Sequence, residues 1–212
     1  MKPIFERPAT CLITQGDATP GTFLQKKKEI TEIVRKAVLA SVSIVQIREK
    51  KLAAKQVFEI ATEAASIAKG SGTLVLVNER LDIALAAGAD GVHLSSRSLD
   101  VGVVRSNTPH GFIIGVSTHF ADEVPRACDN GADFAVFGPV FSTPGKTSPV
   151  GLDELKRVCE LVPRFPVLAL GGIDASNAHS AIEAGAAGFA AIRFMNSDAG
   201  LNFAREIRNA NE

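Results

Sequence analysis

The chain has 212 residues with 23 basic and 23 acidic side chains, so its formal net charge is zero. Apolar residues make up 46% and charged residues 22%, which excludes wholesale disorder and allows a core of ordinary size. Zero net charge gives no bulk attraction to nucleic acid or an anionic membrane, and no apolar run approaches the roughly 18 residues of a membrane span.

The cysteine pattern and the start of the chain predict a cellular compartment. Cys11, Cys128 and Cys159 form no CxxC pair and are odd in number, which indicates thiols in a reducing environment. The first ten residues, MKPIFERPAT, lack the apolar core of a signal peptide. We therefore expect a cytoplasmic protein.

Short apolar runs rich in β-branched residues recur along the chain and predict strands. In chain order they cover residues 10–14, 42–47, 73–77, 91–94, 112–116, 133–137, 166–170 and 188–192. Segments of helical period separate them, and the clearest cover 24–40, 53–69 and 151–162. Strands that are apolar on both faces and alternate with helices indicate a parallel sheet covered by helices.

A weak internal repeat supports a count of about eight strand–helix units. It places Gly88, Gly131 and Gly185 at the ends of helical stretches, each just before an apolar run. The count predicts a single (β/α)8 TIM-barrel domain over residues 1–212. An open doubly wound sheet is the alternative, but it typically has a glycine-rich turn after its first strand, where this chain has only Gly16.

The predicted fifth helix, at 120–130, contains Pro125. Proline is tolerated only in the first turn of a helix. We therefore expect this helix to begin late, capped by Asp122.

The end of the second strand carries an unusual pair of cations. Gln46, Arg48 and Lys50 alternate along the chain and so share one face, opposite Ile47. Arginine offers a planar fork and lysine a point charge, and together they favour a clamp for a polyanion. The alternative is an ordinary charged strand end, with Arg48 paired to a carboxylate.

Polar residues also follow the third and fifth strands. Asn78 and Glu79 carry oxygen ligands that suit Mg²⁺, although the residues alone favour a helix cap. Ser117 and His119 are either a cap with a solvated histidine or part of a pocket with an acid–base group. His93, within a strand, is expected to be a core or rim histidine.

Residues 138–151 are rich in glycine, proline and serine, which predicts a mobile active-site flap. Gly145-Lys146-Thr147 imitates the end of a P-loop. Val140 stands where that motif needs its first glycine, so a nucleotide triphosphatase is excluded.

The last two strands end in Gly171-Gly172 and Ile192-Arg193. The loops after strands seven and eight of such barrels commonly bind phosphate, and bare glycines let it approach the backbone. The alternative is a tight turn, with Arg193 bound to a carboxylate. Two anion sites at one barrel mouth would suit an enzyme that joins two phosphorylated small molecules.

Taken together, the motifs QIREK, NER, ADGVHL, IGVSTH, GADFAVFGPVFSTPGK and ALGGI make the chain resemble thiamine phosphate synthase and its TenI-like relatives. The resemblance extends through nearly the whole chain. It implies a Mg²⁺-dependent transferase of thiamine biosynthesis that joins 4-amino-2-methyl-5-hydroxymethylpyrimidine diphosphate (HMP-PP) to thiazole phosphate and releases pyrophosphate. The partners would be these small molecules, and a homo-oligomer is compatible with the family.

The resemblance also implies a role for each matching residue. The diphosphate would be held by Gln46, Arg48, Lys50, Asn78, Ser117 and Lys146. The thiazole phosphate would be held by Thr143, Gly172, Ile192 and Arg193. The metal positions fall on Glu79 and Ser98, and the catalytic roles on Arg48, Lys146, Ser117 and His119.

The chain departs from the family pattern at four places. Glu79 stands where aspartate is usual, and Ser98 stands in place of the second metal aspartate, with Asp100 two residues further on. Gly145 replaces a common hydroxyl residue and Arg193 a common serine.

Two alternatives to the synthase remain open at this point. One is a TenI-like thiazole tautomerase with His119 as its acid–base group, and the other is a non-catalytic ligand-binding barrel. A tautomerase has no diphosphate to hold, so the presence of Gln46, Arg48 and Lys50 with Lys146 favours the synthase.

Overall fold

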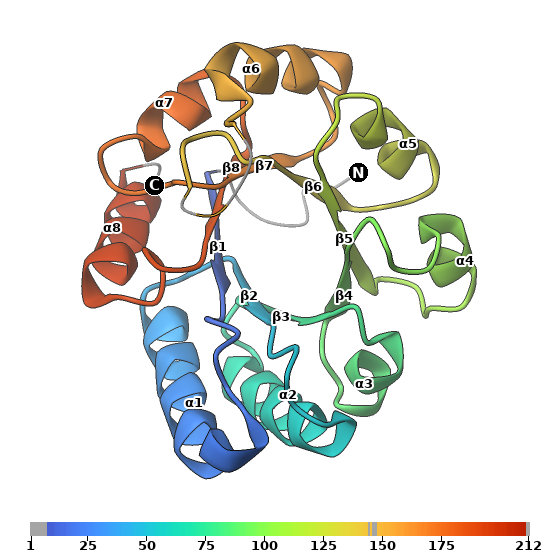
Figure 1. Ribbon diagram of the computed structural model, residues 1–212, viewed down its shortest axis with the longest axis vertical. Coiled ribbons are helices and arrows are strands. Elements are labelled where there is room, and N and C mark those ends of the chain that lie inside the picture. Colours follow the sequence, from blue (N-terminus) through green and yellow to red (C-terminus); the bar gives the residue numbers. More distant parts are fainter. Residues whose placement is uncertain (1–7, 144, 146–147, 211–212) are drawn as a thin grey trace. The chain divides into compact units, whose positions relative to one another are not determined.

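The computed structural model of the chain describes residues 8–143, 145 and 148–210, in which strands and helices alternate (Figure 1). The strands are β1 (Ala9–Ile13), β2 (Ile44–Ile47), β3 (Leu74–Asn78), β4 (Gly91–Leu94), β5 (Ile113–Thr118), β6 (Phe134–Phe137), β7 (Val167–Leu170) and β8 (Gly188–Ala191). The helices are α1 (Phe23–Leu39), α2 (Ala54–Ala68), α3 (Leu81–Ala86), α4 (Val101–Ser106), α5 (Glu123–Asp129), α6 (Gly151–Leu161), α7 (Ala178–Glu183) and α8 (Asp198–Asn209), with a 3-10 turn, η1 (Pro20–Thr22), before α1.

The strands follow one another in the order β1 to β8 and close into a (β/α)8 barrel over the residues that the structure describes. The pairs β1–β2, β2–β3, β3–β4, β5–β6, β6–β7 and β7–β8 are all parallel. Every residue of β2, β4, β6 and β8 is buried, and apart from Gln46 and His93 these strands are apolar, as expected for a sheet that is covered on both faces. The predicted TIM-barrel class is therefore confirmed, and the doubly wound alternative is wrong.

The chain divides into two compact units. One contains the described residues up to Thr10 together with Leu94–Ala191, and the other contains Cys11–His93 together with the residues from Ile192 onward. A single domain over 1–212 stays a prediction.

Local sequence explains the elements within each unit. In α1 the buried positions Ile30, Val34 and Ala37 follow the predicted apolar stripe, and this helix packs beside α2 (Figure 1). The repeated glycines after α3, α5 and α7 all adopt positive φ, as a left-handed helix end requires.

The end of β5 differs from expectation, whereas the start of α5 agrees with it. The strand predicted at 112–116 continues to Thr118, because Ser117 and Thr118 pair with Val136 and Phe137 of β6. Helix α5 begins late, as predicted, with Pro125 in its first turn.

The predicted cap of α5 is wrong in one respect. Asp122 occupies the cap position but makes no side-chain capping bond, and its carboxylate pairs with Arg126 at 2.9 Å. Instead, the carboxylate of Glu123 accepts the backbone N–H groups of His119 at 2.6 Å and Phe120 at 3.2 Å.

None of the helices in the described range is long and apolar enough to cross a membrane. The structure also forms no disulfide among Cys11, Cys128 and Cys159.

Candidate active site

Three polar side chains at the ends of β2 and β3 form a hydrogen-bonded chain. Asn78 Nδ2 donates to Glu79 Oε2 at 3.0 Å, and Gln46 Nε2 donates to Asn78 Oδ1 at 3.0 Å. A carboxylate can only accept, so Glu79 fixes the orientation of the Asn78 amide, which in turn fixes that of Gln46. The cap alternative for Asn78 is therefore wrong, and α3 begins after Arg80 without a side-chain cap.

The hydrogen-bonded series of Gln46, Asn78 and Glu79 leaves one buried acceptor without a donor. Gln46 is 2% exposed, and its Oε1 has no hydrogen-bond partner among the described residues. An unsatisfied buried polar group costs about 1–3 kcal/mol. Phosphate oxygens are themselves acceptors at neutral pH, so this atom suits a ligand that carries an N–H or O–H group.

Arg48 directly follows β2, and a hydrogen bond of its backbone fixes its position. Its N–H donates to the buried Thr14 Oγ1 at 2.8 Å, and a Cβ placed on Gly16 would lie 3.0 Å from Arg48 Nη1. Arg48 has no carboxylate partner in the part of the chain that the structure describes, contrary to the alternative of an ordinary charged strand end. Its guanidinium is therefore available to an anion.

Two residues that the sequence analysis did not single out support this end of the site. The buried carboxylate of Glu49 accepts the backbone N–H groups of Gly16 and Ala18, both at 3.1 Å, and so anchors the loop after β1. Thr14 ties the backbone of Arg48 to β1. Neither contact is visible in sequence spacing, because each joins residues more than thirty positions apart.

Glu79 occupies a left-handed backbone conformation with φ of 62°. Its N–H donates to the carbonyl of His93 in β4 at 2.9 Å, and its Oε2 lies 3.5 Å from Lys50 Nζ. A non-glycine residue in this region costs roughly 1–2 kcal/mol, which the pairing to β4 offsets. The Glu79 carboxylate, which orients the Asn78 amide, therefore lies beside the Lys50 ammonium group.

His93 lies in β4 opposite Asn78 and is 3% exposed. Burial, followed by the charge of Arg48, lowers the pKa of His93 from 6.5 to about 4, while Glu79 acts in the opposite direction. The imidazole is therefore neutral at physiological pH. The prediction of a core or rim histidine agrees with this burial.

We expect His93 to make the protein sensitive to acid. Between pH 6.5 and 4 the unfolded chain takes up a proton that folded His93 excludes, so the free energy of unfolding falls as the pH falls, by up to about 3 kcal/mol. Urea unfolding of the wild type and His93→Asn at pH 7, 6 and 5 measures this. The loss between pH 7 and 5 should shrink in His93→Asn and persist in the control, exposed His110→Asn. Equal losses in both variants would contradict the assignment.

In the other unit, Ser98 and Ser117 line one pocket of about 410 Å³ between the starts of α4 and α5. Ser95, Ser96 and Thr118 add further hydroxyl groups to its wall. Two of the predicted residues therefore line a cavity that combines hydroxyl groups with the charged side chains of Asp100, Glu123 and Arg126.

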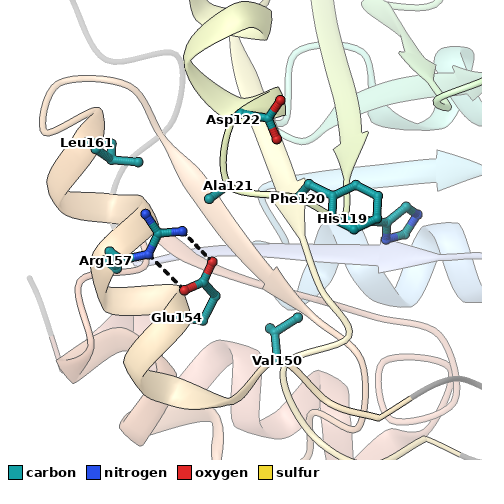
Figure 2. A pocket seen from close by; sticks show the side chains of 8 residues that line it. All are labelled: His119, Phe120, Ala121, Asp122, Val150, Glu154, Arg157 and Leu161. Carbon is teal, nitrogen blue, oxygen red and sulfur yellow. Dashed lines mark hydrogen bonds and ion pairs between the residues drawn. The ribbon is translucent and has the colours of Figure 1, made fainter.

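His119 lines a second pocket, of about 650 Å³, with residues of the loop before α5 and of α6 (Figure 2). Figure 2 shows Phe120 beside His119, and Arg157 joined to Glu154 by two hydrogen bonds of 2.7 and 2.8 Å. His119 Nδ1 lies 2.6 Å from the carbonyl oxygen of Gly138. Because a carbonyl only accepts, Nδ1 carries the proton and Nε2 is left as the basic nitrogen.

The loops after β6 and β7 pack tightly against each other around Gly172. Phe141 N–H donates to the carbonyl of Gly171 at 3.0 Å, and Thr143 Oγ1 donates to the carbonyl of Phe141 at 3.2 Å. A Cβ on Gly172 would lie 2.5 Å from the carbonyl oxygen of Ser142. The structure therefore brings the segment that carries Thr143 up to Gly172, as a shared phosphate site needs.

Ile192 and Arg193 directly follow β8, and Arg193 is exposed. Arg193 has no carboxylate partner among the residues described, so the alternative of a structural ion pair finds no support. The remaining predicted residue, Lys146, lies outside the described residues, as does Thr147 of the P-loop-like segment.

A (β/α)8 barrel whose strand ends carry cations, hydroxyl groups and a bare diglycine is the arrangement of a phosphate-handling barrel enzyme. Residues 11–195 match the family model described as thiamine monophosphate synthase, and the chain belongs to this family. This confirms the resemblance seen in the sequence.

Individual relatives agree with that assignment. A thiamine-phosphate synthase of Methanocella arvoryzae is 42% identical over 164 residues, which cover 76% of this chain and 77% of that protein. A thiamine-phosphate synthase of Gloeobacter violaceus is 41% identical over 78% of this chain, which spans 49% of that longer protein. The solved thiamine phosphate pyrophosphorylase of Pyrococcus furiosus is 29% identical, with a TM-score of 0.80 over 95% of this chain and 94% of that one.

Proposed function

We propose that this chain is a thiamine-phosphate synthase, a transferase that joins HMP-PP to thiazole phosphate and releases pyrophosphate. Its substrates are small molecules. Two features at the end of β2 carry the proposal. Among the described residues, the Arg48 guanidinium has no carboxylate partner, and two residues earlier in the sequence Gln46 has a buried acceptor without a donor. HMP-PP carries both chemistries that this pair suits, a polyanion and an amino group.

The reaction needs charge stabilisation more than a covalent catalyst. The bond between the pyrimidine methylene carbon and the diphosphate oxygen breaks, and pyrophosphate takes the electron pair. The lone pair of the thiazole nitrogen then forms the new C–N bond. Arg48, Lys50 and Lys146 would neutralise the leaving group as its charge grows, and Ser117 would donate a hydrogen bond to it.

Gln46 has a more specific task in this proposal than holding the diphosphate. Its free Oε1 accepts a hydrogen bond from the 4-amino group of the pyrimidine. Such a bond increases electron donation from that nitrogen into the ring, which stabilises the pyrimidine cation. Asn78 and Glu79 act indirectly here, because they hold the Gln46 amide in the required orientation.

The second half of the site would hold the acceptor substrate. Thr143, Gly172, Ile192 and Arg193 bind the phosphate of the thiazole in this proposal. Bare backbone at Gly172 allows close approach of the phosphate, and Arg193 supplies charge. Holding both substrates converts a two-molecule encounter into a step within one complex.

The predicted Mg²⁺ site fits these residues poorly. The described residues contain no group of three or more His, Cys, Asp or Glu side chains that could hold a metal ion. Glu79 offers a carboxylate, but its Oε2 already faces Asn78 and Lys50, and Ser98 offers only a hydroxyl group. Mg²⁺ usually binds through carboxylates and substrate phosphates, and Glu79 and Ser98 together offer only one carboxylate. The proposed reaction therefore relies on the side chains of the protein for charge stabilisation.

The tautomerase remains the second candidate because of one observation. His119 has its tautomer fixed by Gly138, which leaves Nε2 as a base beside a pocket. A proton shift on a bound thiazole requires such a group, whereas the synthase reaction above does not. Cytoplasmic location and self-association stay predictions from the sequence.

We expect the purified protein to form thiamine phosphate from HMP-PP and thiazole phosphate, with one pyrophosphate released for each product molecule. Chromatography of the product and a pyrophosphate assay measure the two yields, and heat-killed protein is the control. The variant His119→Ala should keep most of this activity. No product from the wild type, together with thiazole isomerisation that disappears in His119→Ala, would assign the tautomerase instead.

A further inference from the structure

We propose that the Ser98 hydroxyl replaces a carboxylate–metal contact in this chain, so that diphosphate binds with little dependence on Mg²⁺. This inference rests on the proposed function, since it concerns the same substrate. It follows from the disagreement between the metal site that the family resemblance implies and the side chains that this chain carries.

The loop after β4 holds Ser98 in a tight turn. Ser98 Oγ accepts the backbone N–H of Ser95 at 2.8 Å and lies 3.3 Å from Ser95 Oγ. The backbone N–H of Ser98 in turn donates to the carbonyl of Ser95 at 3.0 Å. A hydroxyl group that accepts in this way still has its own proton to donate, either to Ser95 or to a phosphate oxygen.

The nearby carboxylates are committed to other tasks. Asp100 caps α4, where its Oδ1 accepts the backbone N–H of Gly102 at 2.8 Å. Glu123 Oε2 accepts the two backbone N–H groups before α5. Neither side chain therefore replaces the missing aspartate without giving up a helix start, and Asp100 is not a substitute ligand as the structure stands.

The exchange of aspartate for serine changes the electrostatics of the pocket. A carboxylate at residue 98 would repel a diphosphate unless a cation lay between them. A neutral hydroxyl group does not repel it and can donate a hydrogen bond to it. Asp100 and Glu123 also line this pocket, but their carboxylates accept backbone N–H groups. Ser117 and Ser95 line it too, so diphosphate would meet hydroxyl donors where a carboxylate–metal pair would otherwise stand.

The test compares two added charges in neighbouring segments. Ser98→Asp restores the carboxylate, and Ser106→Asp places the same charge on an exposed residue at the end of α4, which does not line the pocket. Calorimetry measures the affinity of the wild type and both variants for sodium pyrophosphate, once with EDTA and once with saturating Mg²⁺. Thermal unfolding followed by circular dichroism checks that each variant is folded.

We expect the wild-type affinity to change by less than about threefold between the two conditions. Ser98→Asp should bind at least about tenfold more weakly in EDTA and regain the loss in Mg²⁺, while Ser106→Asp should resemble the wild type. A wild type that needs Mg²⁺ to bind, equal weakening in both variants, or no binding by any of them would overturn the inference.

The binding data involve no turnover, so comparing them with the product assay separates this inference from the proposed function. The expected binding pattern without any formation of thiamine phosphate would overturn the synthase assignment and leave the diphosphate site in place. Formation of thiamine phosphate together with strict Mg²⁺ dependence of pyrophosphate binding would support the synthase assignment and overturn the inference about Ser98.

Discussion

Arg48→Ala is expected to lower kcat/KM for HMP-PP by about a hundred- to a thousandfold, because it removes a preorganised donor from the leaving diphosphate. Arg48 has no carboxylate partner among the described residues, so its removal leaves no unpaired acid behind. Its backbone bond to Thr14 is unaffected by the change. Steady-state kinetics should therefore show a loss of activity with little loss of stability.

Two variants control this experiment. Arg48→Lys keeps the charge but loses the planar fork, so its activity should lie between those of the wild type and Arg48→Ala. Arg35→Ala removes an exposed cation of α1 that lies 3.8 Å from Glu32, and should leave activity unchanged. Equal activities of Arg48→Ala and Arg35→Ala would show that Arg48 does not contact the diphosphate.

Gly172→Ala is expected to destabilise the protein by about 2–4 kcal/mol and to raise KM for thiazole phosphate strongly. Its φ is +66°, and a Cβ there would lie 2.5 Å from the carbonyl oxygen of Ser142 and 2.8 Å from Phe141 Cβ. These neighbours cannot easily retreat, because the backbone N–H of Phe141 bonds to the carbonyl of Gly171. Urea unfolding and kinetics with varied thiazole phosphate measure the two effects.

Gly88 provides a matched control for Gly172. It has the same φ of +66°, but a Cβ there would meet nothing within 4 Å. Gly88→Ala should therefore show only the conformational cost, roughly 1–2 kcal/mol, with KM unchanged. If Gly172→Ala behaves like Gly88→Ala in both measurements, the close packing around Gly172 plays no part in the site.

The barrel could be predicted from sequence because its signals are local and repeated. Each strand is a short buried run, each long helix shows an apolar stripe, and the glycines at 88, 131 and 185 end helices in the left-handed conformation. The cap of α5 could not be predicted as reliably. Asp122 and Glu123 are adjacent carboxylates, and which of them reaches the free N–H groups depends on how the chain leaves β5.

Parts of the site depend on contacts between segments far apart in the sequence. The free acceptor of Gln46 results from the pairing of β2 with β3, and the strained backbone of Glu79 results from the pairing of β3 with β4. Strand periodicity places Gln46 and Asn78 at the ends of their strands but does not determine which amide atom faces which. The importance of Thr14 and Glu49 likewise emerges only when the loop after β1 meets the end of β2.

A crystal structure of the protein with pyrophosphate and thiazole phosphate tests the proposed function most directly. We predict pyrophosphate on the side chains of Arg48 and Lys50, and the thiazole phosphate on the backbone of Gly172 with Arg193 beside it. The thiazole nitrogen should point toward the pyrophosphate, with room between them for the pyrimidine methylene carbon. Pyrophosphate bound away from Arg48, or a thiazole nitrogen that faces solvent, would contradict the proposal that this chain joins the two molecules.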